Sequence, residues 1–177
     1  MGGVLMPAMP TLHTARLRLR ALDEGDAPFI LDLLNQPDFL RFIGDRGVRD
    51  LGQARAYLRD GPMASYAGHG SGLLAVELHD GTPVGLCGLL VRAELPAPDI
   101  GFAFLPAYYG QGYAFEAASA LLARERGRPG RGRILAIVSP GNARSIALLR
   151  RLGLRDAGRM RLPGKDEDVL LFETTGG

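Results

Sequence analysis

The fold is decided by one stretch in the middle of the chain, Asp99-Ile100-Gly101-Phe102-Ala103-Phe104-Leu105-Pro106-Ala107-Tyr108-Tyr109-Gly110-Gln111-Gly112-Tyr113-Ala114. The apolar, aromatic-rich run that ends at Pro106 is typical of a strand. A Gly-x-Gly turn follows, and beyond it Ala118, Leu121 and Leu122 stand at helical spacing. A helix that starts directly after such a turn presents unpaired backbone N–H groups at the positive end of its dipole. The stretch therefore predicts a phosphate-binding site between a strand and a helix.

Two common phosphate motifs do not match this stretch. A dinucleotide-binding fingerprint needs a third glycine three residues after Gly112, where this chain has Phe115. A Walker loop needs Gly-Lys-Ser/Thr, and the chain contains no such run. The alternative interpretation is a plain turn between a strand and a helix that binds no phosphate. The rest of the chain is needed to distinguish the two.

Size and composition indicate one globular domain. The 177 residues can bury a sizeable core, and 46% apolar with 23% charged residues is ordinary for such a domain. The apolar runs are far shorter than a membrane span, and the first residues carry no secretory signal, so we expect no membrane partner. The single cysteine, Cys87, excludes an internal disulfide and favours the cytoplasm. His13, His69 and His79 lack metal-ligand spacing, and we expect no metal.

Apolar patterns predict the strands. Leu17–Arg20 alternates strictly, and Asp80-Gly81 is a strong hairpin signal between two apolar runs. Ile134–Val138 is continuously apolar, as in a strand that is buried on both faces. Residues 1–13 show no periodicity and are expected to be loose. Besides the central strand, strands are expected at residues 17–20, 73–78, 84–91, 134–138, 154–160 and 168–172.

Capping residues predict where the first helix begins and ends. Asp23 or Asp26 can cap it, and Asn35-Gln36-Pro37 is expected to end it. Residues 39–46 follow as a loop that is unusually rich in aromatic and charged groups.

Two further helices have similar signals. Asp50 and Gln53 resemble a capping pair for the second helix, which is expected to stop at Gly61-Pro62. The last helix is expected to begin at Asn142 or Ser145. The predicted order is therefore β-α-α-β-β-β-α-β-α-β-β, an α/β fold with a mixed (α+β) sheet, and we expect residues 1–177 to form a single domain.

This order and two motifs resemble the GNAT superfamily of N-acetyltransferases, and the resemblance runs from Thr14 to Phe172. The family's acyl-CoA signature, Arg/Gln-x-x-Gly-x-Gly/Ala, falls on Tyr109, Gly112 and Ala114, with the extra Gly110 that many members carry. The tyrosine departs from the signature, but an aromatic residue followed by Gly-Tyr-Ala is similar to the RimJ/RimL-type branch. A second run resembles the family's Asn-x-x-Ser/Ala…Gly-Phe helix, with Leu in place of Phe at its end: Asn142-Ala143-Arg144-Ser145-Ile146-Ala147-Leu148-Leu149-Arg150-Arg151-Leu152-Gly153-Leu154.

The resemblance implies acetyl-CoA as cosubstrate and no metal. It implies that the central strand and the next strand run parallel and splay apart, with the pantetheine amides pairing with Phe104 and Leu105. The pyrophosphate would meet the N–H groups of Gln111 to Ala114, where glycines allow close approach. The cofactor-binding residues expected on this basis are Phe104, Leu105, Tyr109, Gly110, Gln111, Gly112, Tyr113, Ala114 and Asn142.

The resemblance also implies catalytic groups. Asp99 stands where several members carry a general base, and it could act directly or through water; an ordinary polar residue at a strand start is the alternative, and Glu77 and Glu94 are weaker candidates. Leu149 occupies the position of the usual tyrosine acid, so Ser145 would protonate the leaving thiolate, unless it only caps the helix. A backbone N–H at a bulge near Phe104 would stabilise the oxyanion.

The acceptor is left open by the sequence. In this fold its pocket would be lined by residues 39–46 and by the last hairpin near residues 159–167, whose charges are mixed. With mixed charges, the pocket could accept either a protein N-terminus or a small-molecule amine. The sequence also leaves open whether the protein is a monomer or a homodimer.

Two other functions compete with catalysis. The first is a domain that binds acyl-CoA or regulates without turnover. The second is nucleic-acid binding through the arginines of residues 124–133. Two other interpretations of these arginines are a solvated helix end with its loop and a contact to a CoA phosphate. Because no aromatic residue interleaves these arginines, nucleic acid is disfavoured.

Overall fold

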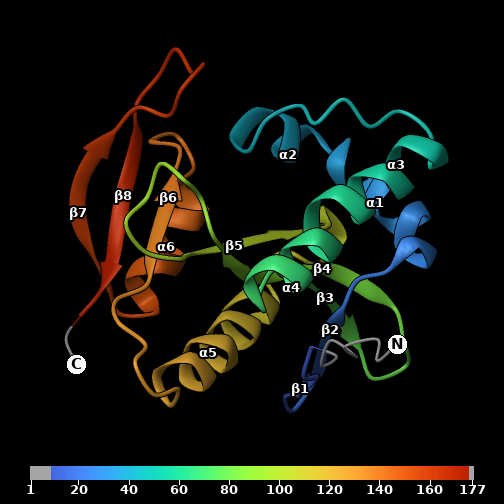
Figure 1. Cartoon of the computed structure of the whole chain (residues 1–177), viewed down its shortest axis with the longest axis horizontal. Coiled ribbons are helices and arrows are strands. Elements are labelled where there is room, and N and C mark those ends of the chain that lie inside the picture. Colours follow the sequence, from blue (N-terminus) through green and yellow to red (C-terminus); the bar gives the residue numbers. More distant parts are fainter. Residues whose placement is uncertain (1–8, 176–177) are drawn as a thin grey trace, which may run out of the picture.

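An eight-stranded mixed sheet forms the centre of the protein, which the computed structural model describes for residues 9–175 (Figure 1). The strand order is β1-β2-β3-β4-β5-β6-β8-β7. The strands are β1 (Leu12–His13), β2 (Leu17–Ala21), β3 (Leu73–Leu78), β4 (Pro83–Leu90), β5 (Asp99–Phe104), β6 (Leu135–Val138), β7 (Leu154–Met160) and β8 (Val169–Thr174). The helices are α1 (Ala27–Leu34), α2 (Pro37–Phe42), α3 (Leu51–Leu58), α4 (Ala64–His69), α5 (Tyr113–Arg126) and α6 (Ala143–Arg151).

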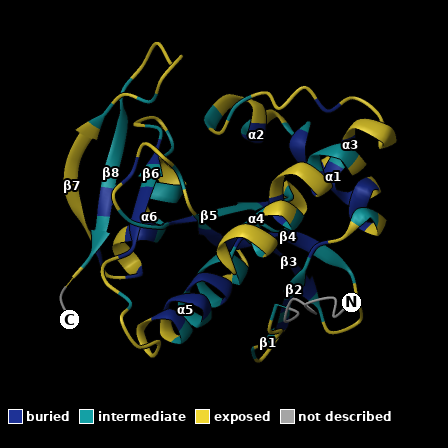
Figure 2. Cartoon of the chain, viewed as in Figure 1, coloured by how far each residue is buried: buried dark blue, intermediate teal, exposed yellow. Residues whose placement is uncertain are grey.

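The two faces of the sheet are covered by different helices. Along β3, Leu74 and Val76 pack in one cluster with α5 and α6, whereas Ala75 packs in a second cluster with α1 and α3. This alternation follows from the period of two of a strand. Figure 2 shows the result: the sheet-facing side of α5 is buried, while the edge strand β7 is largely exposed.

The predicted splay of the two parallel strands is confirmed. Among the described residues, β5 and β6 are paired at one position, Asp99 opposite Leu135, and the Leu135 N–H donates to the Pro98 carbonyl at 2.9 Å. Beyond this point β6 continues its pairing on the other side, with β8. The backbone edge of β5 toward β6 is therefore left open over the rest of the strand.

Three local expectations were wrong. Within residues 1–13, which were expected to be loose, residues 1–8 lie outside the described part, and Leu12–His13 forms β1 against β2. Residues 39–46 are not entirely a loop, because α2 occupies Pro37–Phe42. Pro37, which was expected to end the first helix, is the first residue of α2, because proline is well suited to the first turn of a helix.

The third error concerns Gly61-Pro62, where a helix end was expected. The helix continues through a π-helical turn, η2 (Arg59–Met63), into α4, and the Ala64 N–H reaches back to the Arg59 carbonyl. The wider turn accommodates Pro62, which has no N–H to donate. The helix ends instead at Gly70, which has a φ of 67°.

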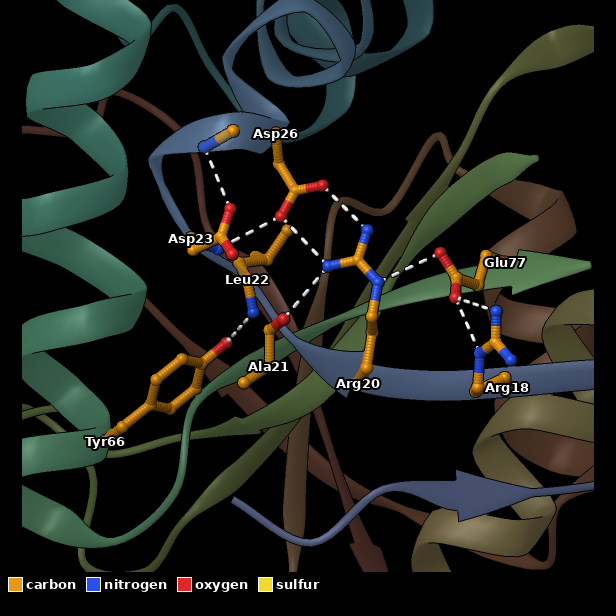
Figure 3. Close-up of polar contacts among 9 residues, drawn as sticks. Arg18, Arg20, Ala21, Leu22, Asp23, Asp26, Tyr66 and Glu77 are labelled. Atoms are coloured by element: carbon orange, nitrogen blue, oxygen red, sulfur yellow. Dashed lines mark hydrogen bonds and ion pairs between the residues drawn. The ribbon is translucent and has the colours of Figure 1, made fainter. Parts of the chain in front are cut away.

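A network of ionised side chains joins β2 and β3 to the helices (Figure 3). Arg20 donates two hydrogen bonds to Asp26, of 2.8 and 3.0 Å, and one to Glu77, which also pairs with Arg18. The Tyr66 hydroxyl of α4 accepts from the Leu22 N–H and donates to the Leu73 carbonyl. Burial raises the Tyr66 pKa to about 12, so the hydroxyl stays neutral and able to donate. The network anchors α1 and α4 to one end of the sheet.

None of the helices in the described part of the chain is both long enough and apolar enough to cross a bilayer.

Candidate functional site

The glycine turn before α5 has the backbone shape that its sequence predicts. Gly110 and Gly112 have φ values of 74° and 82°, a region that L side chains rarely adopt. Gly112 is the N-cap residue of α5 and supplies no capping side chain. The first N–H groups of this 14-residue helix therefore face outward without intrahelical partners. This arrangement suits the phosphates of a nucleotide cofactor.

Arg16 braces this turn, a role that the sequence did not reveal. Its Nη1 donates to the Gln111 carbonyl at 2.8 Å, its Nε donates to Glu116 at 2.7 Å, and its guanidinium lies 4.5 Å from the centre of the Tyr113 ring. Burial opposes ionisation of Glu116, but hydrogen bonds from Thr14 and Arg16 outweigh it and lower the Glu116 pKa. The loop between β1 and β2 thus holds the turn from 95 residues away in sequence.

Two cavities meet at the open edge of β5. The first, here called the α5 cavity, lies between α2, β5, α6 and the N-terminus of α5. The second, the splay cavity, occupies the gap between β5 and β6 and reaches α2 and α3. Residues that line both are Phe39, Phe42, Ile43, Phe102, Ala103, Asn142 and Ser145. The two cavities therefore adjoin each other, and we refer to them together as the channel.

Most of the residues proposed from the sequence border this channel. The α5 cavity is lined by Phe104, Tyr109, Gly110, Gly112, Tyr113, Ala114, Asn142 and Ser145, and the splay cavity by Asp99, Asn142 and Ser145. Gln111 does not line either cavity with its side chain, and its carbonyl accepts from Arg16. Leu105 also lies outside the lining, and its N–H is already bound to the Val84 carbonyl at 2.9 Å. We therefore leave Leu105 out of the proposed cofactor contacts.

Ser145 is not the cap of α6. The helix begins at Ala143, and the Asn142 side chain accepts from the Ser145 N–H at 3.2 Å. The N-cap role that competed with catalysis for Ser145 thus belongs to Asn142. Ser145 stands in the first helical turn, where it borders both cavities.

Asp99 is the buried acidic group of the splay cavity. Its side chain is 1% exposed, and Arg92 Nε donates to its two oxygens at 3.0 and 3.2 Å. Burial raises the Asp99 pKa, and the neighbouring Arg92 opposes that rise. The partnership with Arg92 was not foreseen. The weaker candidates lie elsewhere: Glu77 belongs to the ionic network of Figure 3, and Glu94 is exposed.

The expected bulge near Phe104 is absent from the β4–β5 ladder. These strands pair without a register shift from Gly85 and Phe104 to Leu90 and Asp99. The opening is created on the other edge of β5, by the departure of β6.

Helix α2 is held across the channel at both of its ends. At its N-terminus the Asp38 carboxylate accepts from the Tyr109 hydroxyl at 3.2 Å and lies 3.7 Å from Arg144. The Arg144 guanidinium also lies 4.0 Å from the centre of the Tyr109 ring. At its C-terminus the Phe42 carbonyl accepts from the Ser139 hydroxyl at 2.9 Å. We call the group of Asp38, Tyr109 and Arg144 the α2 clasp.

The two segments expected to line the acceptor pocket contribute unequally. Phe39, Phe42, Ile43 and Arg46 line the splay cavity, whereas residues 159–167 of the last hairpin line neither cavity. The hairpin nevertheless comes close, because Lys165 Nζ lies 3.3 Å from the place where a Cβ on Gly44 would stand.

Four of the five arginines at residues 124–133 form ion pairs within the described part of the protein. Glu125 is buried and lies within 4 Å of Arg124, Arg128 and Arg131. Arg133 pairs with Glu173 at 2.9 Å. Helix α5 ends at Arg126 and most of residues 126–133 are exposed, as expected for a solvated helix end and loop. Across residues 9–175, no three His, Cys, Asp or Glu side chains gather in a way that could hold a metal ion.

Comparison with known proteins assigns the family. Residues 16–155 match the model of the acetyltransferase (GNAT) domain. The chain is 27% identical over 169 residues to the uncharacterized N-acetyltransferase p20 of Bacillus licheniformis, covering 93% of this chain and 95% of that protein. It superposes on the crystal structure of an acetyltransferase from Agrobacterium tumefaciens with a TM-score of 0.80 and 27% identity. The superposition covers 99% of this chain and 100% of that chain.

A structure of RimL, a ribosomal L7/L12 alpha-N-protein acetyltransferase in complex with coenzyme A, is also similar. Its TM-score is 0.79, its coverage is 93% of this chain and 97% of that one, and its identity is 19%, so this likeness concerns the fold alone. The matched domain, the splayed strand pair and the glycine turn agree, and the chain belongs to the GNAT acetyltransferase family as an acyltransferase.

Proposed function

We propose that this protein transfers the acetyl group of acetyl-CoA to a primary amine by direct attack in a ternary complex. One observation carries the proposal: Asp99 and Ser145 border the same splay cavity, which adjoins the α5 cavity at the glycine turn. A site that joins two substrates needs its phosphate-binding end and its reacting groups to lie next to each other.

Acetyl-CoA would enter through the α5 cavity. The N–H groups of Gln111 to Ala114 would receive its pyrophosphate, with Arg16 holding the turn in shape. Tyr109 and Tyr113 would contact the cofactor from the walls, and the open edge of β5 near Phe104 would pair with the pantetheine amides. The thioester would then lie in the splay.

The chemistry needs a proton acceptor and a proton donor. The amine would attack the thioester carbonyl carbon, and Asp99 would take the proton that the amine loses, through water because its carboxylate is buried against Arg92. As the C–S bond breaks, the Ser145 hydroxyl would protonate the thiolate, and solvent would restore the serine proton. The products are an amide and the thiol of CoA.

The finer assignment to the RimJ/RimL-type branch rests on the motifs at Tyr109–Ala114 and Asn142–Ser145 and on the fold likeness to RimL. Within this branch both a protein N-terminus and a small amine are acceptors to test.

An amine panel tests the proposal. The protein is incubated with acetyl-CoA and single amines, and free thiol and acetylated amine are measured together. We expect amine-dependent release of one thiol for each amide formed. Binding of acetyl-CoA by calorimetry without amide formation from any amine would contradict the proposal and favour a domain that only binds acyl-CoA.

A further inference from the structure

The acceptor end of the splay cavity is lined mainly by apolar side chains. Away from Ser145 its wall is formed by Phe39, Phe42 and Ile43 from α2 and the residue after it, Tyr57 from α3 and Leu90 from β4. Such a wall contributes to binding by removing apolar area from water, about 25 cal/mol per Å². It offers little to a ligand that is covered with hydroxyl or amide groups, because each such group loses water without gaining a partner.

The charges around this cavity are more positive than negative. Of the described residues that line it, Arg46 and Asp99 are charged. The Asp99 carboxylate is already paired with Arg92. At the Tyr57 hydroxyl, burial raises the pKa while the positive charges of Arg46 and Arg92 both oppose that rise. Two guanidinium groups therefore act on this part of the cavity against one carboxylate.

Two polar side chains of the lining already have hydrogen-bond partners within the protein. The Ser139 hydroxyl donates to the Phe42 carbonyl, and the Asn142 side chain accepts from the Ser145 N–H. A peptide that entered the cavity would have to bury its amide groups beside these occupied partners.

We infer that the acceptor is a small monoamine with an apolar body, such as an arylalkylamine, and that Arg46 excludes amines with several positive charges. This inference rests on the proposed acetyl transfer and names its substrate class. The single ammonium group would lose its proton in the splay, while the apolar body packs against α2 and Tyr57. A second ammonium group would have to be desolvated near Arg46, which repels it.

The first test compares three acceptors with the whole protein and acetyl-CoA: 2-phenylethylamine, spermidine and a short peptide with a free N-terminal serine. We expect kcat/KM for 2-phenylethylamine to exceed that for each of the others by at least about a hundredfold. A preference for spermidine or for the peptide would overturn the inference but leave acetyl transfer to amines intact. Absence of any acetylated amine, with acetyl-CoA bound, would instead contradict the proposed function itself.

The second test uses a matched pair of substitutions, one on α2 and one at the residue directly after it. Ile43 and Leu40 are equally exposed, at 36%, but Ile43 lines both cavities and Leu40 lines neither. We expect Ile43→Asp to lower kcat/KM for 2-phenylethylamine at least about tenfold, because a carboxylate replaces apolar wall, while Leu40→Asp has no such effect. Because Ile43 also lines the α5 cavity, calorimetry first gives the acetyl-CoA affinity of each variant, and kcat/KM for the amine is then compared at saturating acetyl-CoA. Equal activity of the two variants on this amine would overturn the inference.

The third test reverses the charge that is proposed to select against polycations. Arg46→Glu should raise kcat/KM for spermidine at least about tenfold relative to 2-phenylethylamine, and calorimetry on the CoA-saturated protein should show a matching gain in spermidine affinity. The exposed Arg49, which pairs with Asp45 and lines neither cavity, supplies the control Arg49→Glu. If both reversals change the spermidine preference equally, the effect is general and the role of Arg46 is refuted.

Discussion

The Tyr109 hydroxyl donates a hydrogen bond to the Asp38 carboxylate at 3.2 Å and joins two segments that lie 71 residues apart in sequence. Burial, together with the negative charge of Asp38, raises the Tyr109 pKa, so the hydroxyl keeps the proton that it donates. Since Arg144 contacts both residues, the α2 clasp links three walls of the α5 cavity.

Tyr109→Phe keeps the aromatic ring under Arg144 and removes the hydrogen bond to Asp38. We expect acetyl-CoA to bind about fivefold more weakly and to dissociate faster, because a hydrogen bond of this kind contributes about 1 kcal/mol to holding α2 over the cavity. Stopped-flow and calorimetry measure both quantities. A double-mutant cycle with Asp38→Asn is the control. If the losses in acetyl-CoA binding free energy of the two single variants add up to that of the double variant, the residues do not act through their mutual contact.

Gly112→Val should weaken acetyl-CoA binding at least tenfold, about 1.4 kcal/mol. The φ of 82° is unfavourable for a β-branched residue, and a Cβ would stand 3.3 Å from Arg16 Nη2, at the brace of the turn. Gly130→Val introduces similar strain, at a φ of 74°, in a loop with open space around it. Calorimetry measures acetyl-CoA affinity in the two folded variants. If only Gly112→Val binds more weakly, the loss comes from the phosphate-binding turn and not from backbone strain in general. The prediction fails if both variants bind acetyl-CoA as the original protein does.

Ser145→Ala should lower kcat by roughly 10²-fold or more, the usual range for a lost general acid, and should change acetyl-CoA affinity little. Steady-state kinetics with the best acceptor of the panel measures this. Ser119→Ala on α5, at a serine that lines neither cavity, is the matched control. Turnover of Ser145→Ala within a factor of a few of the original would assign the serine a purely structural role.

Asp99 and Arg92 should together set the rising limb of the pH–rate profile. Burial raises the Asp99 pKa, and the base works only when ionised, so kcat/KM should fall as the pH drops through that raised value. Asp99→Asn should flatten the limb. Arg92→Gln should move it to higher pH, since Arg92 opposes the rise in the Asp99 pKa. A limb that stays in place in both variants would mean that another group titrates.

Asp26→Asn should destabilise the fold by about 2 kcal/mol, which lowers Tm by roughly 4–8 °C in a chain of this size. Asp26 accepts two hydrogen bonds from Arg20, and the two side chains are 9% and 30% exposed, so solvent screens the pair only in part. The control is Asp45→Asn. Asp45 pairs with Arg49, and both side chains are about half exposed, so this substitution should leave Tm unchanged. Calorimetric scans of both variants decide, and equal Tm values for the two would contradict the prediction.

The sequence by itself determined those features that depend on near neighbours. The Gly-x-Gly run predicted the turn in which Gly110 and Gly112 have positive φ, Asp80-Gly81 predicted the hairpin of β3 and β4, and Ile134–Val138 predicted a buried strand. Alternation, capping and turn chemistry act within a few residues, so they can be interpreted without the fold. With the family motifs added, they were enough to predict the splayed strand pair.

The tertiary structure decided everything that depends on contacts between distant segments. The expected loop at residues 39–46 holds part of α2, since helix formation by so short a segment is determined by packing and by anchors such as Asp38 to Tyr109. The partnership of Asp99 with Arg92 and the brace from Arg16 to Glu116 depend on where whole elements meet. No local pattern contains that information, because the partners are brought together only when the strands take their register and the helices pack on the sheet.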